Sequence, residues 1–457
     1  EVKQCGIYEA TVRSFGMTPE RLQNISAADQ QLERETAQYI EARNRGGERD
    51  DIITIPVVFH VIHNNGSENI SSAQIYDALT VANRDFNALN PDLDEIVSSF
   101  SEITGDIQIE FALARRDPDG DCHSGINRIV SEETYVGEEE VKFLIQWPRN
   151  KYLNVWVCAE ASGAAGYTYY PGSVNNSNDA YLDGIVIKHS YTGSIGTSNN
   201  YRSRVLTHEI GHWLNLRHLW GNSNTPGEED NCDQDDNVSD TPNSKGWTFC
   251  NLEGESCGSL DNVQNYMEYS YCCKMFTEGQ KSRMRTAALS SVAQRNQLST
   301  SSNLIATGVE GDIMLCESRF TVDELVICEG DSILFTDESY HGVNTWEWDF
   351  ADGTVLSGSE EGVHNITYHT FNTEGFFEVV LTVSNDNSTL ASSPMTITVL
   401  PAGVMNSPAI QGFESVEFPS PEWFIEDPFN DGGWEATTEA SYSGTHSLHL
   451  DNWSNDI

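Results

Sequence analysis

Lysine and arginine are scarce in this sequence, and long apolar runs are missing. There are 25 Lys and Arg against 70 Asp and Glu, which gives a formal net charge of -45 at pH 7. A surface that binds nucleic-acid phosphates needs cationic side chains to displace counterions, so we expect no nucleic-acid partner. Because no run of about 18 apolar residues occurs, we also expect no membrane-spanning helix.

The chain also opens without a signal peptide. Several of its 10 cysteines lie a few residues apart in loop-like sequence, which is typical of disulfides formed in oxidising compartments. We therefore expect a secreted, extracellular protein whose signal has already been removed. The 457 residues are too many for one hydrophobic core, and a hydrophobic content of 38% indicates folded domains, so about two to four domains are expected.

Residues 1–50 are polar and charged, and residues 27–44 have the pattern of a hydrophilic helix. An exposed basic segment rich in glycine is a natural site of proteolysis. We therefore expect processing near the end of this helix, with an ordinary loop as the alternative. The basic segment consists of Arg43, Arg45, Gly46, Gly47 and Arg49.

Residues 51–305 combine buried strands with long helices. Short apolar runs predict the strands, and apolar residues at helical spacing predict the helices. This mixture indicates an α/β or α+β domain. The expected strands are residues 55–62, 107–114, 152–158 and 184–189, and the expected helices are residues 72–89 and 202–214.

Residues 316–401 form an all-β module, because short alternating runs are separated by turn residues. Trp346–Phe350, followed by Asp352-Gly353 and later by Val380–Val383, resembles the polycystic-kidney-disease-type (PKD) immunoglobulin-like domain. The resemblance implies a small β-sandwich. Residues 405–457 resemble the start of a carbohydrate-binding or MAM-like jelly roll, which is incomplete. Both β modules are candidates for contact with glycans or matrix.

The most informative stretch runs from Thr207 to His218. His208 and His212 are four residues apart, so on a helix they lie on the same face and can bind one metal ion. Glu209 lies next to the pair and can reach a water molecule on that metal.

His218 is too far along the chain to share the helical face of the first two histidines, so the helix must end before it. Asn215 suits the left-handed conformation with which helices commonly end. Three neutral histidines form a tetrahedral zinc site whose fourth position is open to water. The spacing therefore predicts a catalytic zinc site.

This stretch resembles the metzincin pattern H-E-x-x-H-x-x-G-x-x-H, with Asn215 in place of the glycine. Asn265–Tyr269 resembles the metzincin Met-turn, and the combination resembles the pappalysin family over about residues 52–290. The resemblance implies an α+β metzincin fold with a mixed sheet and an active-site helix. It also implies that Met267 forms the floor under the metal, and that residues 163–171 contain an edge strand that pairs with substrate.

The resemblance further implies a metalloendopeptidase that acts on proteins or peptides. Zinc would polarise the scissile carbonyl and acidify its water. Glu209 would take the proton and pass it to the leaving amine, and Tyr269 could donate to the oxyanion. The alternative for Tyr269 is a packed aromatic residue.

Cys5-Gly6 resembles the cysteine switch of pappalysin-like zymogens. A thiolate binds zinc well and would replace the catalytic water, and cleavage near Arg43–Arg49 would release it. The alternative for Cys5 is a disulfide. By family analogy we expect bridges Cys232–Cys257 and Cys250 to Cys272 or Cys273, of which we choose Cys273; Cys122–Cys158 and Cys316–Cys328 are weaker predictions.

Calcium is the second metal that the resemblance implies. Residues 228–236 are dense in carboxylates, and an Asp-Thr-Pro sequence follows them. Calcium takes six to eight oxygen ligands, often from one loop. We predict Asp236, Asp240 and Thr241 as ligands, against a loop that is merely solvated.

The family's preference for basic side chains depends on acidic residues just after the Met-turn. Tyr271–Lys274 has none and includes a lysine, which argues against that preference here. Two other functions remain open: an adhesin or glycan-binding protein with an inactive zincin domain, and a structural zinc protein. The presence of Glu209 argues against the first.

Overall fold

The computed structural model describes residues 5–15, 19–46, 51–311, 315–359, 366–386, 388–402, 434–439, 441 and 444–450. The chain divides into two units, Glu1–Asp312 and Ile313–Ile457. Among the helices of these described ranges, none has both the length and the apolar character needed to cross a membrane.

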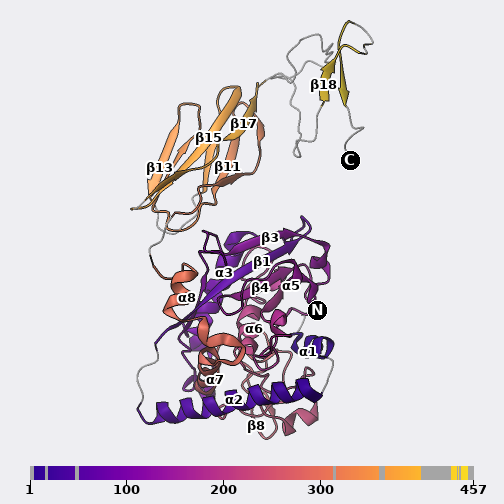
Figure 1. Cartoon of the computed structure of the whole chain (residues 1–457), viewed down its shortest axis with the longest axis vertical. Helices are drawn as coiled ribbons and strands as arrows, with labels where there is room; N and C mark the ends of the chain where they lie inside the picture. Colours follow the sequence, from indigo (N-terminus) through magenta and orange to yellow (C-terminus); the bar gives the residue numbers. More distant parts are fainter. Residues whose placement is uncertain are drawn as a thin grey trace. The chain divides into compact units, whose positions relative to one another are not determined.

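The first unit is built on a mixed sheet in the order β2-β1-β4-β6-β5, with β3 also paired to β1 (Figure 1). All pairings are parallel except that of β5 with β6. Strand β1 is buried almost throughout, as expected for a parallel strand covered on both faces. Strand β5 lies at the edge of the sheet. The strands are β1 Ile53–His63, β2 Ile109–Leu113, β3 Ile126–Val130, β4 Leu153–Cys158, β5 Gly166–Tyr167 and β6 Ile185–Lys188.

Helix α3 (Ser72–Phe86) packs an apolar face against this sheet. Ser71 caps its first turn, because its side chain accepts a hydrogen bond from the Gln74 backbone. The helix ends before the predicted Leu89, since Ala88 adopts a positive φ of 48°. The other helices after residue 51 are α4 Ser98–Ser101, α5 Glu140–Leu144, α6 Val205–Trp213, α7 Glu278–Leu289 and α8 Ser301–Ala306, and a short hairpin joins β7 Glu255–Ser256 to β8 Ser259–Leu260.

The N-terminal segment forms two helices, α1 (Ile7–Phe15) and α2 (Pro19–Asn44). Helix α2 is longer than predicted, and α1 was not predicted. Figure 1 shows α2 lying across α7. Ala28 and Leu32 of α2 are buried in one cluster with Ala287 and Val292, and Arg283 of α7 binds the Glu33 carboxylate.

The predicted cleavage segment follows α2. Arg43 pairs with Glu278 of α7, and Arg45 pairs with Glu41 on its own helix. Gly46 is exposed, with a φ of 85°. Arg49 lies outside the described residues.

The second unit contains the predicted β-sandwich. One sheet has the order β10-β17-β15-β12-β13, with β16 paired to β15, and the other has the order β14-β11-β9. Phe335, Trp348 and Phe350 fill the space between the sheets. The strands are β9 Phe320–Val322, β10 Val326–Cys328, β11 Ser332–Asp337, β12 Thr345–Asp349, β13 Val355–Ser359, β14 Ile366–Thr370, β15 Gly375–Ser384, β16 Thr389–Ala391 and β17 Met395–Leu400.

Most of residues 405–457 lies outside the described residues. The described part includes one antiparallel pair, β18 (Trp434–Thr437) with β19 (Ser447–Leu450). The jelly-roll likeness therefore stays a prediction.

The disulfides differ from three of the four predictions. Cys232–Cys257 forms as expected, but Cys250 bonds to Cys272 rather than Cys273. Cys273 is turned away, with its thiol 2.7 Å from the Ser270 carbonyl. Cys158 and Cys328 are free thiols, so the bridges Cys122–Cys158 and Cys316–Cys328 are wrong. Cys158 is fully buried in an apolar cluster, whereas Cys122 lies on an exposed turn.

Candidate active site

Helix α6 carries the first two histidines and Glu209 into the interior. Asn215, just beyond it, has a φ of 73°, the left-handed conformation expected there. The Leu216 N–H then donates to the Gly211 carbonyl at 2.9 Å, and Arg283 holds the turn by donating to the Asn215 carbonyl at 2.7 Å. This tight reversal brings His218 back to the histidines of α6.

The three imidazoles converge through their Nε2 atoms. His212 Nε2 lies 3.1 Å from the Nε2 atoms of both His208 and His218. The Nδ1 atoms of His208 and His212 donate to the carbonyls of Tyr266 and Leu216 at 2.7 and 2.8 Å, so their Nε2 atoms carry lone pairs. Burial lowers the pKa of His208 to about 4, and burial together with the neighbouring histidines lowers the pKa of His212 and His218 well below the usual range. Lone pairs so close repel one another unless a cation lies between them, so the three residues fit a metal ion.

Cys5 supplies a fourth donor. Its Sγ atom and the three imidazole nitrogens all lie within 4.8 Å of one another, and all four residues are buried. Three nitrogens and one sulfur are a tetrahedral donor set that suits zinc. The structure thus brings together Cys5, His208, His212 and His218, as predicted for a latent zinc site.

The backbone around Cys5 is held on both sides. The Gly6 N–H donates to the Gly166 carbonyl of β5 at 2.8 Å. The Cys5 carbonyl accepts from the Tyr269 hydroxyl at 3.2 Å and from Asn224 Nδ2 at 3.1 Å. A Cβ atom at Gly6 would lie only 2.9 Å from the Ala164 side chain, which explains why glycine follows the cysteine.

Glu209 is completely buried beside the four donors. Its Oε2 accepts from the Cys5 thiol at 3.5 Å, and its Oε1 has no hydrogen-bond partner among the described residues. Burial raises the pKa of Glu209 to about 8. A Cβ atom at Gly166 would lie 3.2 Å from Glu209 Cγ, so the main chain of β5 passes directly over this carboxyl.

Met267 lies beneath the site. It is fully buried, and its Sδ atom is 2.5 Å from where a Cβ atom on Gly211 would be. The turn that presents it is fixed by Asn265, whose Oδ1 accepts from the Met267 N–H at 2.9 Å. The same turn positions the Tyr266 carbonyl to hold His208, so the Met-turn orients a histidine as well as packing under the helix.

An aromatic shell surrounds the histidines, and sequence reasoning found only one of its members, Tyr269. The Tyr269 ring lies 4.8 Å from the His218 ring. Trp220 stacks on His218 with ring centroids 4.5 Å apart and an angle of 8°, and Tyr170 meets the His212 ring edge at 5.6 Å. Trp220 follows His218 by two residues, and that proximity was the available signal.

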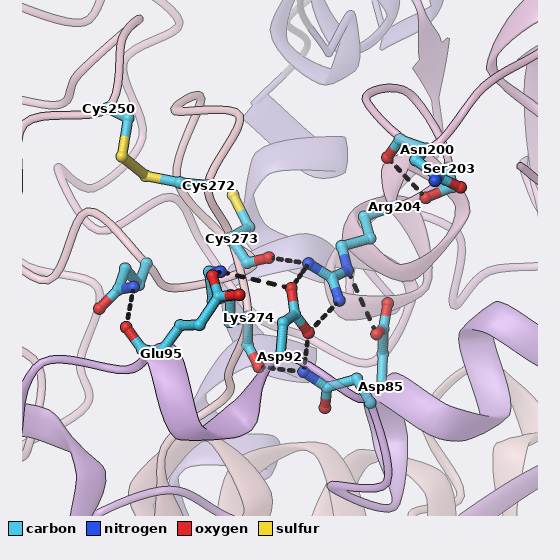
Figure 2. Close-up of polar contacts among 12 residues, drawn as sticks. Asp85, Asp92, Glu95, Asn200, Ser203, Arg204, Cys250, Cys272, Cys273 and Lys274 are labelled. Carbon is cyan, nitrogen blue, oxygen red and sulfur yellow. Dashed lines mark hydrogen bonds and ion pairs between the residues drawn. A yellow bond between two sulfur atoms is a disulfide. The ribbon is translucent and has the colours of Figure 1, made fainter.

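A pocket opens beside Glu209 and His208. Its far wall contains Arg204, whose guanidinium donates to both carboxylate oxygens of Asp92 at 2.8 and 2.7 Å and lies 3.3 Å from Asp85. Figure 2 shows this guanidinium pointing at Asp92, Asp85 and the Cys273 carbonyl, with Lys274 on the other side of Asp92. The other lining residues include Tyr201, Val205, Tyr266, Glu268, Ser270 and Tyr271.

The three predicted calcium ligands take part in two separate hydrogen-bonded groups. Asp236 is buried and accepts from the Thr241 hydroxyl at 2.8 Å. Asp240 instead accepts from the Thr277 hydroxyl and the Gly279 N–H, at 2.6 and 2.8 Å, at the start of α7. Among the described residues, no clustered group of metal-binding side chains includes Asp236 or Asp240, so calcium stays a prediction.

Comparison with known proteins adds two family matches. Residues 137–289 match the family described as pregnancy-associated plasma protein-A, and residues 321–399 match the PKD domain. An extracellular metalloprotease of Podospora anserina is 29% identical over 289 residues, which cover 60% of this chain and 89% of that protein. One from Neurospora crassa is 38% identical over 142 residues, 29% of this chain and 47% of that protein.

Two solved structures from Tannerella forsythia are also similar. A promirolysin mutant is 29% identical with a TM-score of 0.56, over 68% of this chain and all of that one (100%). Mature mirolysin in complex with a cleaved peptide is 34% identical with a TM-score of 0.50, over 56% of this chain and 99% of that one. The family match at residues 137–289 includes strands β4 to β6, the α6 histidines and the Met-turn.

Proposed function

This chain belongs to the pappalysin family of metzincin zinc metalloproteases and is a metalloendopeptidase, and from that premise we propose that it is a secreted zymogen whose zinc site is closed by Cys5. The observation that carries the proposal is the convergence of the Cys5 thiol with His208, His212 and His218. The name of the similar promirolysin structure, a pro-form, and the extracellular location named for its relatives support it.

His208, His212 and His218 would hold zinc, which supplies a Lewis acid that polarises a peptide carbonyl and acidifies water. Glu209 is the general base: it accepts a proton at a carboxylate oxygen and later delivers that proton to the leaving amine. Its Oε1 has no partner among the described residues, so this oxygen is available for the proton. The walls of Met267, Trp220 and Tyr170 exclude bulk water.

Tyr269 is the donor to the developing oxyanion. In the latent chain its hydroxyl lies 3.2 Å from the Cys5 carbonyl, a peptide carbonyl next to the metal site. A scissile carbonyl in the same place would receive the same hydrogen bond, which strengthens as negative charge develops on the oxygen.

Substrate main chain would pair with the open edge of β5. Gly6 already pairs there, through its bond to the Gly166 carbonyl. The absence of a side chain at Gly166 lets an extended peptide lie close to Glu209. The cleaved peptide in the similar mature mirolysin structure supports peptide substrates.

Activation requires the N-terminal segment to leave. Cleavage in the basic segment after α2, near Arg43–Arg49, would free α1 and α2 and take Cys5 away from the metal. Calcium binding at the loop of Asp236, Asp240 and Thr241 and glycan or matrix contact through the β modules are further proposals. A binding protein with an inactive zincin domain is disfavoured, since Glu209 is buried at the metal site where a catalytic base is needed.

The test is metal content together with hydrolysis. The purified chain should contain one zinc per molecule, and in the chain freed of residues 1–50 Glu209→Gln should keep that zinc while losing peptide hydrolysis by about 10²- to 10⁴-fold, the usual contribution of a general base. A Glu209→Gln variant that retains both zinc and full activity would remove Glu209 from the mechanism.

A further inference from the structure

Arg13, near the end of α1, is bound by side chains from outside the N-terminal segment. Its Nε and Nη2 atoms donate to the two carboxylate oxygens of Glu139 at 3.0 and 2.9 Å. Its Nη1 atom donates to Ser162 Oγ at 2.7 Å and lies 3.4 Å from Glu138 Oε1. The guanidinium also lies over the Tyr167 ring, 5.7 Å from its centroid. A two-pronged carboxylate contact with an aromatic face is a typical arginine-binding arrangement.

These side chains are oriented by partners that do not belong to the N-terminal segment. Glu139 is only 9% exposed and also accepts a hydrogen bond from the Tyr169 hydroxyl. Ser162 donates to Glu138 Oε1 at 2.9 Å. Removal of residues 1–50 takes away Arg13 and the contacts of the Tyr169 hydroxyl with Ser14 and the Ala10 carbonyl, but the contacts of Tyr169 with Glu139 and of Ser162 with Glu138 lie wholly outside that segment.

Removal of the N-terminal segment changes the charge of this site. In the latent chain the carboxylates of Glu138 and Glu139 face two cations, Arg13 and the buried Lys142, which lies 4.8 Å from the centroid of the Tyr169 ring. Losing Arg13 leaves two carboxylates and one cation. A second cation is then needed to restore the balance.

The site lies along the edge where substrate would pair. Tyr167 directly follows Gly166 on β5, and Gly6 pairs with Gly166. At about 1.5 Å per residue, Arg13 lies roughly 10 Å from Gly6 along the axis of α1. An extended peptide covers that distance in about three residues.

We propose that Glu138, Glu139, Ser162 and Tyr167 form a substrate subsite for a cationic side chain about three or four residues from the scissile bond. The planar fork of contacts fits arginine better than lysine. Arg13 fills this subsite in the latent chain and leaves it on activation. This inference rests on the proposed function, because it requires a protease whose N-terminal segment departs.

The experiment uses the chain freed of residues 1–50 and three variants, Glu139→Gln, Glu138→Gln and Glu140→Gln. The Glu140 carboxylate lies within 4.8 Å of those of Glu138 and Glu139, but Glu140 is exposed and the structure gives it no contact to Arg13, so it is the matched control for local negative charge without a direct contact. One fluorogenic peptide is made with arginine, lysine, norleucine or glutamate at each position two to five residues from the cut, on both sides. The readouts are kcat/KM and, in the Glu209→Ala background, binding by fluorescence anisotropy.

We expect arginine to raise kcat/KM about tenfold over norleucine on one side of the cut, with lysine intermediate. The ratio of kcat/KM for the arginine peptide to kcat/KM for the norleucine peptide should fall close to one in Glu139→Gln and should fall in part in Glu138→Gln. In Glu140→Gln the ratio should persist. No preference for arginine, or a preference unchanged in Glu139→Gln, overturns the subsite. Cleavage of the norleucine peptide tests the protease itself: if every peptide resists, the proposed function fails, and the subsite is decided by the binding ratios alone.

Discussion

At the scale of single residues, the proposed metal site depends on histidines that are neutral. Its latent form also depends on Cys5, whose atoms take the place of substrate. The carbonyls of Tyr266 and Leu216 fix two imidazoles as Nδ1–H tautomers, which leaves their Nε2 lone pairs for metal. We propose that the Cys5 thiol and carbonyl occupy the positions that a water molecule and a scissile carbonyl take in the active enzyme. Two predictions follow from these positions, one for Cys5 and one for Tyr269.

Replacing Cys5 should weaken latency without cleavage. The N-terminal segment is anchored by several linked contacts, among them the Cys5 thiol beside the histidines, Arg13 on Glu139, and α2 on α7, and loss of one linked anchor lowers avidity by roughly 10²-fold. Full-length Cys5→Ala should therefore hydrolyse a fluorogenic peptide when the uncut wild type does not. Cys328→Ala, which removes an exposed free thiol from the second unit, should remain latent. Equal silence in both variants would show that Cys5 is not the inhibitory group.

Tyr269→Phe removes the proposed oxyanion donor and keeps the ring that packs beside His218. In the chain freed of residues 1–50 we expect kcat to fall by about 10²-fold with KM nearly unchanged, as for other single oxyanion donors. Steady-state kinetics of peptide hydrolysis measure kcat and KM separately. A raised KM with an unchanged kcat would instead indicate that Tyr269 only binds substrate.

At the scale of elements, the α6 helix and its terminus could be predicted from sequence, because four-residue spacing and the conformational tolerance of asparagine are local properties. The same holds for β1, β2, β4 and β6, which are short apolar runs. Helix α1 was not predicted, and strand β5 was expected within residues 163–171 only from the family resemblance, because a nine-residue helix and a two-residue strand depend on contacts from distant residues. The disulfide partner of Cys250 was missed for the same reason: adjacent cysteines differ only in which way they point.

The left-handed residue after α6 gives the third prediction. A β-branched residue at a φ of 73° is strained by about 1–2 kcal/mol, so Asn215→Val should lower the melting temperature and weaken zinc retention. Asn215→Gly, which has no Cβ, should behave like wild type. Thermal unfolding and zinc content of the two variants test this, and equal behaviour of valine and glycine would contradict it.

The loop after the Met-turn gives the fourth prediction. The side chain that follows the cut belongs to the leaving amine, so it should enter the pocket next to Glu209. Arg204 lines this pocket, and the carboxylates of Asp92 and Asp85 that lie against it are already paired with its guanidinium. Burial raises the pKa of Glu268, which also lines the pocket, to about 8, so an entering cation would meet a carboxyl that resists ionisation.

We therefore expect peptides with leucine or phenylalanine after the cut to be hydrolysed at least about tenfold faster than those with arginine, since an unpaired buried charge costs more than this factor. Cys273→Asp, which adds a carboxylate to the pocket, should reduce the difference in hydrolysis rate between these two kinds of peptide. Faster cleavage before arginine in the wild type would contradict this expectation. It would indicate that the arginine pairs with Glu268, whose Oε2 has no partner among the described residues.

At the scale of the whole molecule, the first unit contains both the catalytic domain and the N-terminal segment that we propose as its inhibitor. Helix α2 buries Ala28 and Leu32 against the α7 region, and α1 covers the edge of β5. The second unit is a β-sandwich with its own core. We therefore expect latency to be a property of the first unit and to persist in a chain that ends before the sandwich.

The most direct test of the central claim is casein hydrolysis before and after limited trypsin cleavage near Arg43–Arg49, beside a Glu209→Ala control. The account predicts hydrolysis that appears only after cleavage, that a chelator abolishes, and that the control never shows. Equal activity before and after cleavage would contradict inhibition by Cys5. Silence in both samples, with zinc bound and residues 1–50 removed, would contradict the protease itself.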